Sequence, residues 1–440
     1  MRLRVAACLL SVVSLLLSGC LTLNPVRRGD PWGGEPRLPP PAPQKLIPTV
    51  RIAKVIGWPR DRTPVAPPGF VVTRYADRLD HPRWLYVLPN GDVLVSEAST
   101  QPHPDPGIKE HLMHMMKRRG GSLGRSANRI TLLRDADGDG VVEHRSVFLS
   151  GLNQPLGMAL KGDTLYVANT DAVLAFPYVE GADRITAQGR LIARLPAGAG
   201  VSSPGHWTRN LELSPDGTKL YVSIGSVSNI GEDGLDIEQG RGEIREIDLA
   251  TGAMRTFASG LRNPNGMDFE PTTGVLWTVV NERDLLGDDT PPDYLTSVRD
   301  GGFYGWPWSY WGKTVDTRVE PPRPDRVARA LTPDFALGAH TASLGLEFYR
   351  ASAFPARWHG GAFVGQHGSW NRSEPTGYKV VFVPFADGRP AGPAEDFLWG
   401  FLAPGNRAYG RPVAVAVDRT GALLVTDDAG NMVWRVAPAR

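Results

Sequence analysis

The 440-residue chain has few cysteines, little net charge and no glycine loop of the nucleotide-binding type. Its two cysteines, Cys8 and Cys20, lie near the N-terminus, so the chain after Cys20 can form no internal disulfide and must be stabilised by a large apolar core. Lys and Arg number 48 against 46 Asp and Glu, and no basic run is longer than Lys117–Arg119, which argues against a nucleic-acid partner. The missing Gly-x-Gly-x-x-Gly loop argues against a nicotinamide cofactor.

The N-terminus has the parts of a secretory signal. Two arginines precede a short apolar run, Val5–Leu17, and the sequence Leu17-Ser18-Gly19-Cys20 follows. A run this short is typical of a cleaved signal and not of a membrane-spanning helix. We therefore expect residues 1–19 to be removed and Cys20 to be lipidated, which would anchor the protein in the cell envelope. Leu21, in place of an aspartate, favours the outer membrane, with the protein facing the periplasm.

Residues 20–66 are rich in proline and have little apolar periodicity. This composition favours an extended, semi-rigid tether between the lipid anchor and the domain. A short apolar stretch within it, residues 47–56, could dock on the domain. The globular part is predicted to span residues 67–440.

From residue 67 onwards the sequence predicts an all-β domain. The chain contains 50 Gly and 39 Pro, and tight-turn sequences recur, each followed by a short apolar, β-branched strand. Six such strands are predicted, at residues 92–96, 164–168, 220–224, 275–279, 362–364 and 422–426. Repetition of one strand–turn–strand unit favours a radial arrangement, and we expect a six-bladed β-propeller. Its long loops would gather at the mouth of the central channel, where ligands bind.

Two segments interrupt the β pattern. Lys109–Arg119 is predicted to be a Met-rich helix that packs over the mouth or edge of the propeller, with metal binding through His111 and His114 as the less favoured alternative. The stretch Asp135-Ala136-Asp137-Gly138-Asp139-Gly140 resembles the first half of a calcium loop, but its twelfth position is Ser146 instead of Glu. The pattern favours a polar hairpin turn, with weak calcium binding through Glu143 as the alternative.

Polar clusters adjoin several of the predicted turns. His206 lies just before one predicted strand pair, where the near-neutral pKa of histidine suits a general base. Arg262 and Asn263 precede a proline and can present a guanidinium and an amide together to anionic oxygens. Three further clusters combine carboxylates, amides and arginines, at residues 281–289, 366–372 and 406–431. Each alone is an ordinary turn or surface, but their shared position beside blade turns indicates one site.

Together these segments resemble the quinoprotein sugar dehydrogenases, which include the soluble glucose dehydrogenase and the sorbosone dehydrogenase-like proteins. The resemblance spans about residues 67–436 and is most specific at three motifs, Gly260–Gly266, Gly301–Pro307 and Asp427–Asn431. The sorbosone-like branch looks closest, through Pro82–Val95, Ser126–Arg134 and Gln366–Arg372. The resemblance implies a six-bladed propeller that binds pyrroloquinoline quinone (PQQ) and calcium at the channel mouth and oxidises an aldose at its anomeric carbon.

The resemblance also implies roles for individual residues. His206 would remove the hydroxyl proton while hydride passes from the sugar to the quinone, and Arg262 would polarise the quinone carbonyls. Binding of the cofactor would fall to a group of polar residues: Asn263, Arg283, His367, Arg407, Arg411 and Asp427. The backbone carbonyls of Asp284 and Leu285, with Asp289 nearby, would hold calcium, which raises the electrophilicity of the quinone.

Three functions fit these residues. The first is PQQ-dependent oxidation of an aldose or sugar aldehyde, with electrons passing to a respiratory acceptor. The second is a calcium-dependent propeller hydrolase such as a lactonase, which needs a channel metal held by side-chain carboxylates and amides. The third is a non-catalytic propeller that binds a glycan or an envelope partner. Gly205 bears on this choice, because the glucose enzyme has an acid at this position that orients the base, and an unoriented histidine is a poor base.

Overall fold

The computed structural model describes residues 32–43, 49–101, 108–197 and 205–439. Cys20 and the predicted signal lie outside these residues. Within the described ranges the fold is almost entirely β, with two α-helices, α2 (Ile108–Arg119) and α3 (Pro324–Val327), and two 3-10 turns, Leu235–Glu238 and Ala356–Trp358. No helix in these ranges has the length and apolar character needed to span a bilayer.

Six antiparallel sheets of four strands follow one another along the described chain. The first contains β4 (Pro82–Val87), β5 (Val93–Glu97), β6 (Arg129–Arg134) and β7 (His144–Leu149). The second contains β8 (Met158–Lys161), β9 (Thr164–Ala168), β10 (Ala172–Pro177) and β11 (Arg190–Arg194). The third contains β12 (Leu211–Leu213), β13 (Lys219–Ile224), β14 (Glu243–Asp248) and β15 (Met254–Ser259), with a short parallel strand β19 (Gly302–Phe303) added outside β15.

The remaining three sheets repeat this pattern. The fourth contains β16 (Pro264–Phe269), β17 (Leu276–Val280), β18 (Pro292–Ser297) and β22 (Phe335–Ala339), with β1 (Trp32–Gly33) at its edge. The fifth contains β23 (Ser343–Phe348), β24 (Ala362–Gln366), β25 (Lys379–Val383) and β28 (Glu395–Leu398). The sixth contains β31 (Pro412–Val417), β32 (Leu423–Asp427), β33 (Met432–Pro438) and β3 (Phe70–Ala76). Smaller sheets lie outside these six. One contains β2 (Lys54–Val55), β30 (Arg407–Ala408) and β29 (Leu402–Ala403). In two others β20 (Ser309–Tyr310) pairs with β21 (Thr314–Val315), and β26 (Phe385–Ala386) pairs with β27 (Arg389–Pro390).

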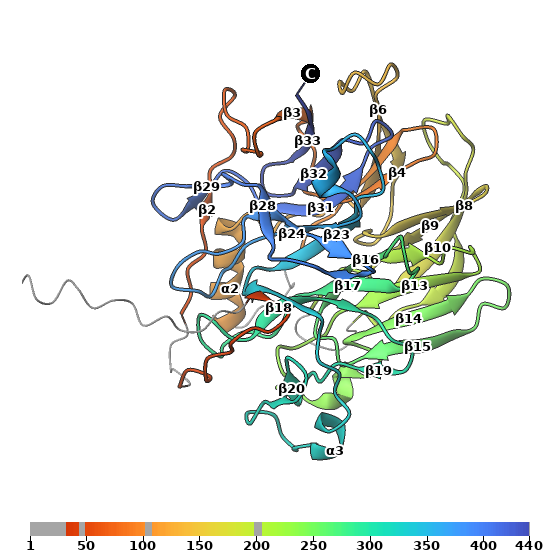
Figure 1. Ribbon diagram of the computed structural model, residues 1–440. Helices are drawn as coiled ribbons and strands as arrows, with labels where there is room; N and C mark the ends of the chain where they lie inside the picture. Colours follow the sequence, from red (N-terminus) through yellow and green to blue (C-terminus); the bar gives the residue numbers. More distant parts are fainter. Residues whose placement is uncertain (1–31, 44–48, 102–107, 198–204, 440) are drawn as a thin grey trace, which may run out of the picture.

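The first strands of the six sheets form a ring. Packing runs from β4 to β8, β12, β16, β23 and β31, and β31 packs back against β4. The sixth sheet combines β31–β33 from the C-terminus with β3 from the N-terminal part of the chain, so main-chain hydrogen bonds join both ends of the domain (Figure 1). The all-β prediction is confirmed, and the second strand of every sheet lies where the sequence predicted a strand.

Apolar side chains lie between neighbouring sheets. One cluster, for example, joins Phe363 and Val380 of the fifth sheet to Val415 and Trp434 of the sixth. The second strands are buried along their whole length, as in β17 and β24, because adjacent sheets cover both of their faces. Continuous apolar runs are the sequence pattern that such strands need.

The polar loops that connect second to third strands lie at the end of the ring where the first strands begin, because neighbouring strands are antiparallel. We call this end the mouth. The connection from β5 to β6 carries α2, which confirms the predicted helix. Figure 1 shows α2 and β2 on the same side of the molecule.

The N-terminal segment packs along the mouth. Within residues 20–66, the predicted tether, the described part contacts the domain from Trp32 onwards. The Ala42 amide donates to the carbonyl of Leu286, and β2 pairs with β30. The indole of Trp58 is buried and donates to the Asp427 carboxylate at 2.6 Å. Burial of this indole explains the docking, because a tryptophan left in water forgoes a large hydrophobic gain.

Candidate active site

Polar side chains stand at the mouth, within five residues of the start of each first strand. They come from all six sheets: His81, Gln154, His206, Arg262, His340 and Arg411. Because the first strands pack as a ring and begin at the same end, these side chains share one end of that ring. Two of them, His206 and Arg262, are the residues that the sequence analysis placed at the centre of the chemistry.

The imidazole of His206 is held by the main chain. Its Nδ1 lies 2.9 Å from the carbonyl oxygen of Ser226. A carbonyl only accepts hydrogen bonds, so Nδ1 carries the proton and Nε2 keeps its lone pair in the neutral ring. Burial, followed by the nearby Arg262 guanidinium, holds the pKa of His206 well below its usual value. The imidazole is therefore a neutral base at pH 7, with its tautomer fixed.

Gly205 has no room for a side chain. Its φ is +64°, and a Cβ here would lie 2.2 Å from the carbonyl oxygen of Val227. An orienting acid cannot stand at this position, and the Ser226 carbonyl takes over that role. The turn that supplies the carbonyl is fixed by Glu238, whose carboxylate accepts from the amides of Val227 and Ser228 at 2.8 and 2.7 Å.

Arg262 is buried beside His206 and pairs with Asp284. Its guanidinium donates to the Glu282 carbonyl at 2.7 Å and lies 3.1 Å from the Asp284 carboxylate. Burial by itself would raise the pKa of Asp284, but Arg262 and His340 outweigh that effect and lower the pKa to about 2. Asp284 is thus an ionised carboxylate that fixes the position of the guanidinium.

Asn263, predicted to bind a cofactor, lies against the same group. It is buried, and a Cβ on Gly225 would come within 2.2 Å of the Asn263 Oδ1 and 2.7 Å of the His206 Cβ. Across the described residues, Oδ1 has no hydrogen-bond partner. Such an atom in a protein interior usually faces water or a ligand.

The predicted calcium ligands are engaged by protein groups. The carbonyl of Asp284 accepts from Asn229 at 3.1 Å and from Arg283 at 3.0 Å. The carbonyl of Leu285 accepts from Arg318, and the carboxylate of Asp289 pairs with Arg372 at 2.6 Å. The guanidinium of Arg283 pairs with buried Asp316. Arg283, Leu285 and Asp289 thus bind protein partners, which are Asp316, Arg318 and Arg372 respectively.

A second group at the mouth is centred on Asp428. Its buried carboxylate lies 2.6 Å from Arg83, 2.9 Å from His367 Nε2 and 3.3 Å from His81. Burial alone would raise the pKa of Asp428, but these three basic groups hold it well below its usual value. Burial, followed by Arg411, lowers the pKa of His367 to about 3, so its imidazole is neutral. The guanidinium of Arg83 lies 5.6 Å from the Trp207 ring, which connects this group to His206.

Sequence reasoning missed His81, Arg83 and Asp428. Arg83 and Asp428 lie within motifs of the resemblance and His81 immediately precedes one, yet nothing in their spacing shows that one carboxylate gathers three basic side chains from distant parts of the chain. The signal available was the pair of motifs itself, Pro82–Val95 and Asp427–Asn431.

The structure places the three predicted C-terminal residues, Arg407, Arg411 and Asp427, in different surroundings. Arg411 is buried, donates to the carbonyls of His367 and Gly368 at 2.9 and 2.6 Å, and supports the His367 loop. Arg407 lies in β30, exposed, and donates to the carbonyl of Pro404. Asp427 binds the indole of Trp58, and burial raises its pKa to about 6. Arg411 and Asp427 lie together beside the His367 loop, because the Arg411 amide donates to the Asp427 carboxylate at 2.7 Å, whereas Arg407 is exposed.

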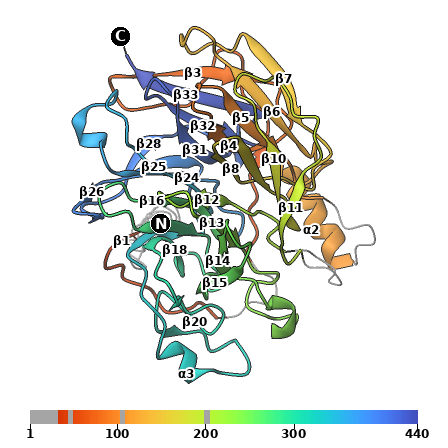
Figure 2. The same cartoon turned by 90° about the vertical axis from the view of Figure 1, so that its right-hand side faces the viewer.

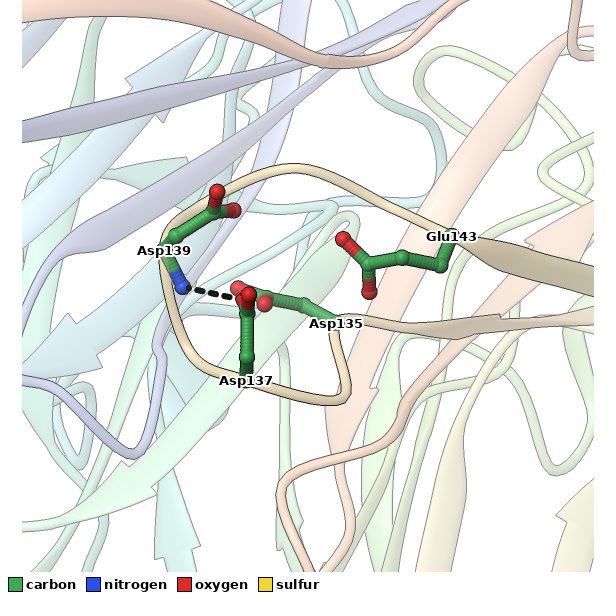
Figure 3. A group of neighbouring side chains, drawn as sticks. All are labelled: Asp135, Asp137, Asp139 and Glu143. Carbon is green, nitrogen blue, oxygen red and sulfur yellow. Dashed lines mark hydrogen bonds between the residues drawn. The ribbon is translucent and has the colours of Figure 1, made fainter.

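The acidic turn after β6 lies at the opposite end of that strand from the α2 connection. The ligand atoms of Asp135, Asp137, Asp139 and Glu143 lie within 4.8 Å of one another, and Figure 3 shows the four side chains on the turn. Each aspartate also accepts from a turn amide, as when the Gly140 amide donates to Asp135 at 2.9 Å. The predicted polar turn is confirmed, and Glu143 is part of the acidic group.

The fold and the mouth define a class of protein: an all-β ring of sheets whose polar mouth holds a neutral, oriented histidine beside an arginine. The TrAA12-like family model matches residues 64–291 and 325–439, and the chain belongs to this family.

Individual relatives agree with this assignment. A pyrroloquinoline quinone-dependent sugar dehydrogenase of Hypocrea jecorina is 25% identical over 272 residues, which cover 56% of this chain and 57% of that protein. The holo form of the pyranose dehydrogenase PQQ domain from Coprinopsis cinerea has a TM-score of 0.68 at 21% identity, covering 88% of this chain and all of that one. A calcium structure of a Trichoderma reesei family AA12 carbohydrate-active enzyme has the same score and identity, covering 90% and 99%.

Proposed function

We propose that this protein is a PQQ-dependent oxidoreductase that oxidises an aldose or a sugar aldehyde, with the six sheets as the blades of a β-propeller. The observation that carries the proposal is the hydrogen bond from His206 Nδ1 to the Ser226 carbonyl, beside Arg262. It supplies a neutral base whose basic nitrogen is fixed, next to a cation that can stabilise developing negative charge. The named activities of the relatives support the same conclusion.

The residues at the mouth fit a polar, anionic cofactor. Within the described part of the chain, the buried polar atoms there that lack a hydrogen-bond partner include Arg83 Nε, Arg262 Nε and Asn263 Oδ1. PQQ is a tricarboxylate, and arginines are the side chains best suited to carboxylates. Arg262 and Asn263 would bind it beside the base, with Arg83 and His367 contributing from the Asp428 group and Arg411 supporting that group.

The chemistry divides between cofactor and protein. Bound PQQ would accept the hydride released from the oxidised sugar carbon. His206 takes the hydroxyl proton of the sugar at Nε2, and the resulting imidazolium keeps its Nδ1 hydrogen bond to Ser226. Arg262 is held by Asp284 and needs no reorganisation to stabilise negative charge.

Calcium is the second proposed component, supported by the calcium structure of the Trichoderma reesei relative. The loop at residues 284–289 is the proposed site, through the carbonyls of Asp284 and Leu285. Arg318 now donates to the Leu285 carbonyl, so calcium binding there requires this guanidinium to move away. No step of the chemistry above depends on calcium.

The hydrolase alternative is less well supported. A lactonase needs several side-chain carboxylates around a metal at the mouth. Among the described residues, the carboxylate group with metal-like spacing is the acidic turn after β6, at the end of that strand remote from the mouth. The non-catalytic alternative rested on the missing acid at position 205. The carbonyl of Ser226 orients the His206 imidazole instead, so the missing acid no longer favours this alternative.

The cellular setting is proposed from the sequence. Lipidation of Cys20 would place the domain on the envelope, and a respiratory carrier would accept its electrons. The contacts of Trp32 and Trp58 with the domain then keep its N-terminal side close to the anchor.

The test is a titration of the purified protein with PQQ and calcium, followed by quinone absorbance and thermal stability, and then a screen of aldoses with an artificial acceptor. Tight binding with a raised melting temperature and turnover of a sugar would support the proposal. If no binding occurs at high micromolar PQQ, the dehydrogenase proposal fails.

A further inference from the structure

A cavity of about 330 Å³ lies at the outer edge of the third sheet, where β19 pairs with β15. Its walls come from the end of β15, from the turn before β19 and from the segment that carries α3. Figures 1 and 2 both show α3 at one extremity of the molecule. The volume lies at the lower end of the range for small-molecule pockets.

Three arginines line this cavity, Arg299, Arg326 and Arg329. In the described chain, none of the three makes an ion pair with a carboxylate. The guanidinium of Arg326 lies 6.0 Å from the Phe303 ring, and its Nε is buried without a hydrogen-bond partner in the described ranges. The wall is therefore strongly basic and also presents an aromatic face.

The nearby carboxylates are already engaged elsewhere. Asp300, on the cavity wall, accepts from both terminal nitrogens of Arg255, at 2.5 and 2.8 Å. Asp325, next to Arg326, accepts from Arg323 at 2.8 and 2.7 Å. The positive charge of the cavity is thus not compensated by the carboxylates beside it. Arg299 and Arg329 are exposed and Arg326 is partly buried, so an anion at this wall would meet three positive charges, of which that of Arg326 is least screened by water.

We propose that this cavity binds an anionic sugar, a monosaccharide that carries a carboxylate or a phosphate. The arginines supply planar forks that match either group, and Phe303 and Leu331 offer an apolar wall for the C–H face of a pyranose ring. The cavity shares no lining residue with the group around His206 and Arg262.

The experiment is calorimetric titration of the full protein at low ionic strength with glucuronate, glucose 6-phosphate and glucose. We expect one or both anions to bind, the affinity to fall with added salt, and glucose to give no heat from this cavity. Arg326→Gln and, separately, Arg329→Gln should weaken anion binding by about tenfold, since each removes a charged hydrogen-bond donor.

Arg357→Gln is the matched control. Arg357 is an exposed arginine over an aromatic ring, 4.2 Å from Trp358, in the 3-10 turn that precedes β24. Binding should be unchanged in this variant, and its weakening in Arg326→Gln and Arg329→Gln places the anion in the cavity. Binding of glucuronate alone identifies a carboxylate ligand, and binding of glucose 6-phosphate alone a phosphate ligand. The proposal is overturned if neither anion binds at 10-millimolar concentrations, or if Arg357→Gln weakens binding as much as Arg326→Gln.

Discussion

The Nδ1 atom of His206 lies 2.9 Å from the main-chain carbonyl oxygen of Ser226. This contact fixes which imidazole nitrogen is basic without any acidic side chain. A backbone carbonyl cannot be lost by point mutation, and its position depends on the turn that Glu238 holds. The orientation of the His206 imidazole is therefore a property of the fold.

Replacing His206 with alanine should abolish most turnover. We expect kcat to fall about 10²–10⁴-fold, the usual contribution of a general base, while PQQ affinity stays within about threefold. Steady-state kinetics and PQQ titration of the same preparation measure both. Equal kcat in the variant and the parent protein would remove His206 from the chemistry.

The pH profile follows from the lowered pKa of His206. The base is active when it is unprotonated. Activity should therefore remain constant as the pH falls through about 6.5, the usual pKa of histidine, and should decline only in more acidic solution. The profile of kcat/KM between pH 4 and 9 tests this expectation. A decline centred at pH 6.5 or above would show that another group is the base.

Gly205→Ala should both destabilise the protein and disturb the base. Gly217→Ala is the matched control, because Gly217 has a similar φ of +67° and its Cβ would meet nothing nearer than 3.9 Å. We expect the control to lose about 1 kcal/mol, the cost of a left-handed alanine. Gly205→Ala must also displace the Val227 backbone, so its loss should be about 2 kcal/mol larger, with kcat at least about tenfold lower. Denaturant unfolding and kinetics of the two variants distinguish the effects; equal losses in both would contradict the steric argument.

Glu347 should make stability depend on pH. It faces Asp268, Glu212 and Arg350 from the first strands at the end remote from the mouth, and burial followed by Asp268 raises its pKa to about 8. A carboxyl whose pKa is higher in the folded state stabilises the fold fully below its unfolded pKa of about 4.3, and this contribution is lost as the pH rises towards 8. The glutamine in Glu347→Gln cannot ionise. As the pH rises from 5 to 8, the melting temperature of this variant should therefore increase relative to that of the parent protein.

The control for that series is Glu180→Gln, at an exposed position. Its melting curve should follow that of the parent protein across the same pH range. Parallel curves for Glu347→Gln and the parent protein would show that Glu347 ionises equally in the folded and unfolded states.

Arg318→Gln should strengthen calcium binding at the 284–289 loop. The variant removes a positive charge and the competing donor to the Leu285 carbonyl, and we expect the calcium concentration for half-maximal stabilisation to fall about tenfold. Arg323→Gln, which breaks a surface pair with Asp325, is the control. An unchanged calcium affinity would place calcium elsewhere, and Asp137→Asn would then test the acidic turn after β6.

Much of the fold was predictable because its signals are local. Tight turns followed by apolar runs located the second strand of every sheet, and the Met-rich stretch located α2, since turn chemistry and periodicity depend on residues close together in the sequence. His206, Arg262, Asn263 and Arg411 were recognisable for the same reason: each stands beside a turn.

The tertiary structure decided what depends on distant residues. Contacts between sheets determine which side chains surround Asp428 and leave no room for a side chain at Gly205. Such contacts also give Arg283 its partner Asp316, and the N-terminal segment gives Asp427 its partner Trp58. A sequence specifies the strands through short-range preferences, but the charge around a carboxylate or the hydrogen bond of an imidazole is fixed only when the ring of sheets brings separate loops to one end.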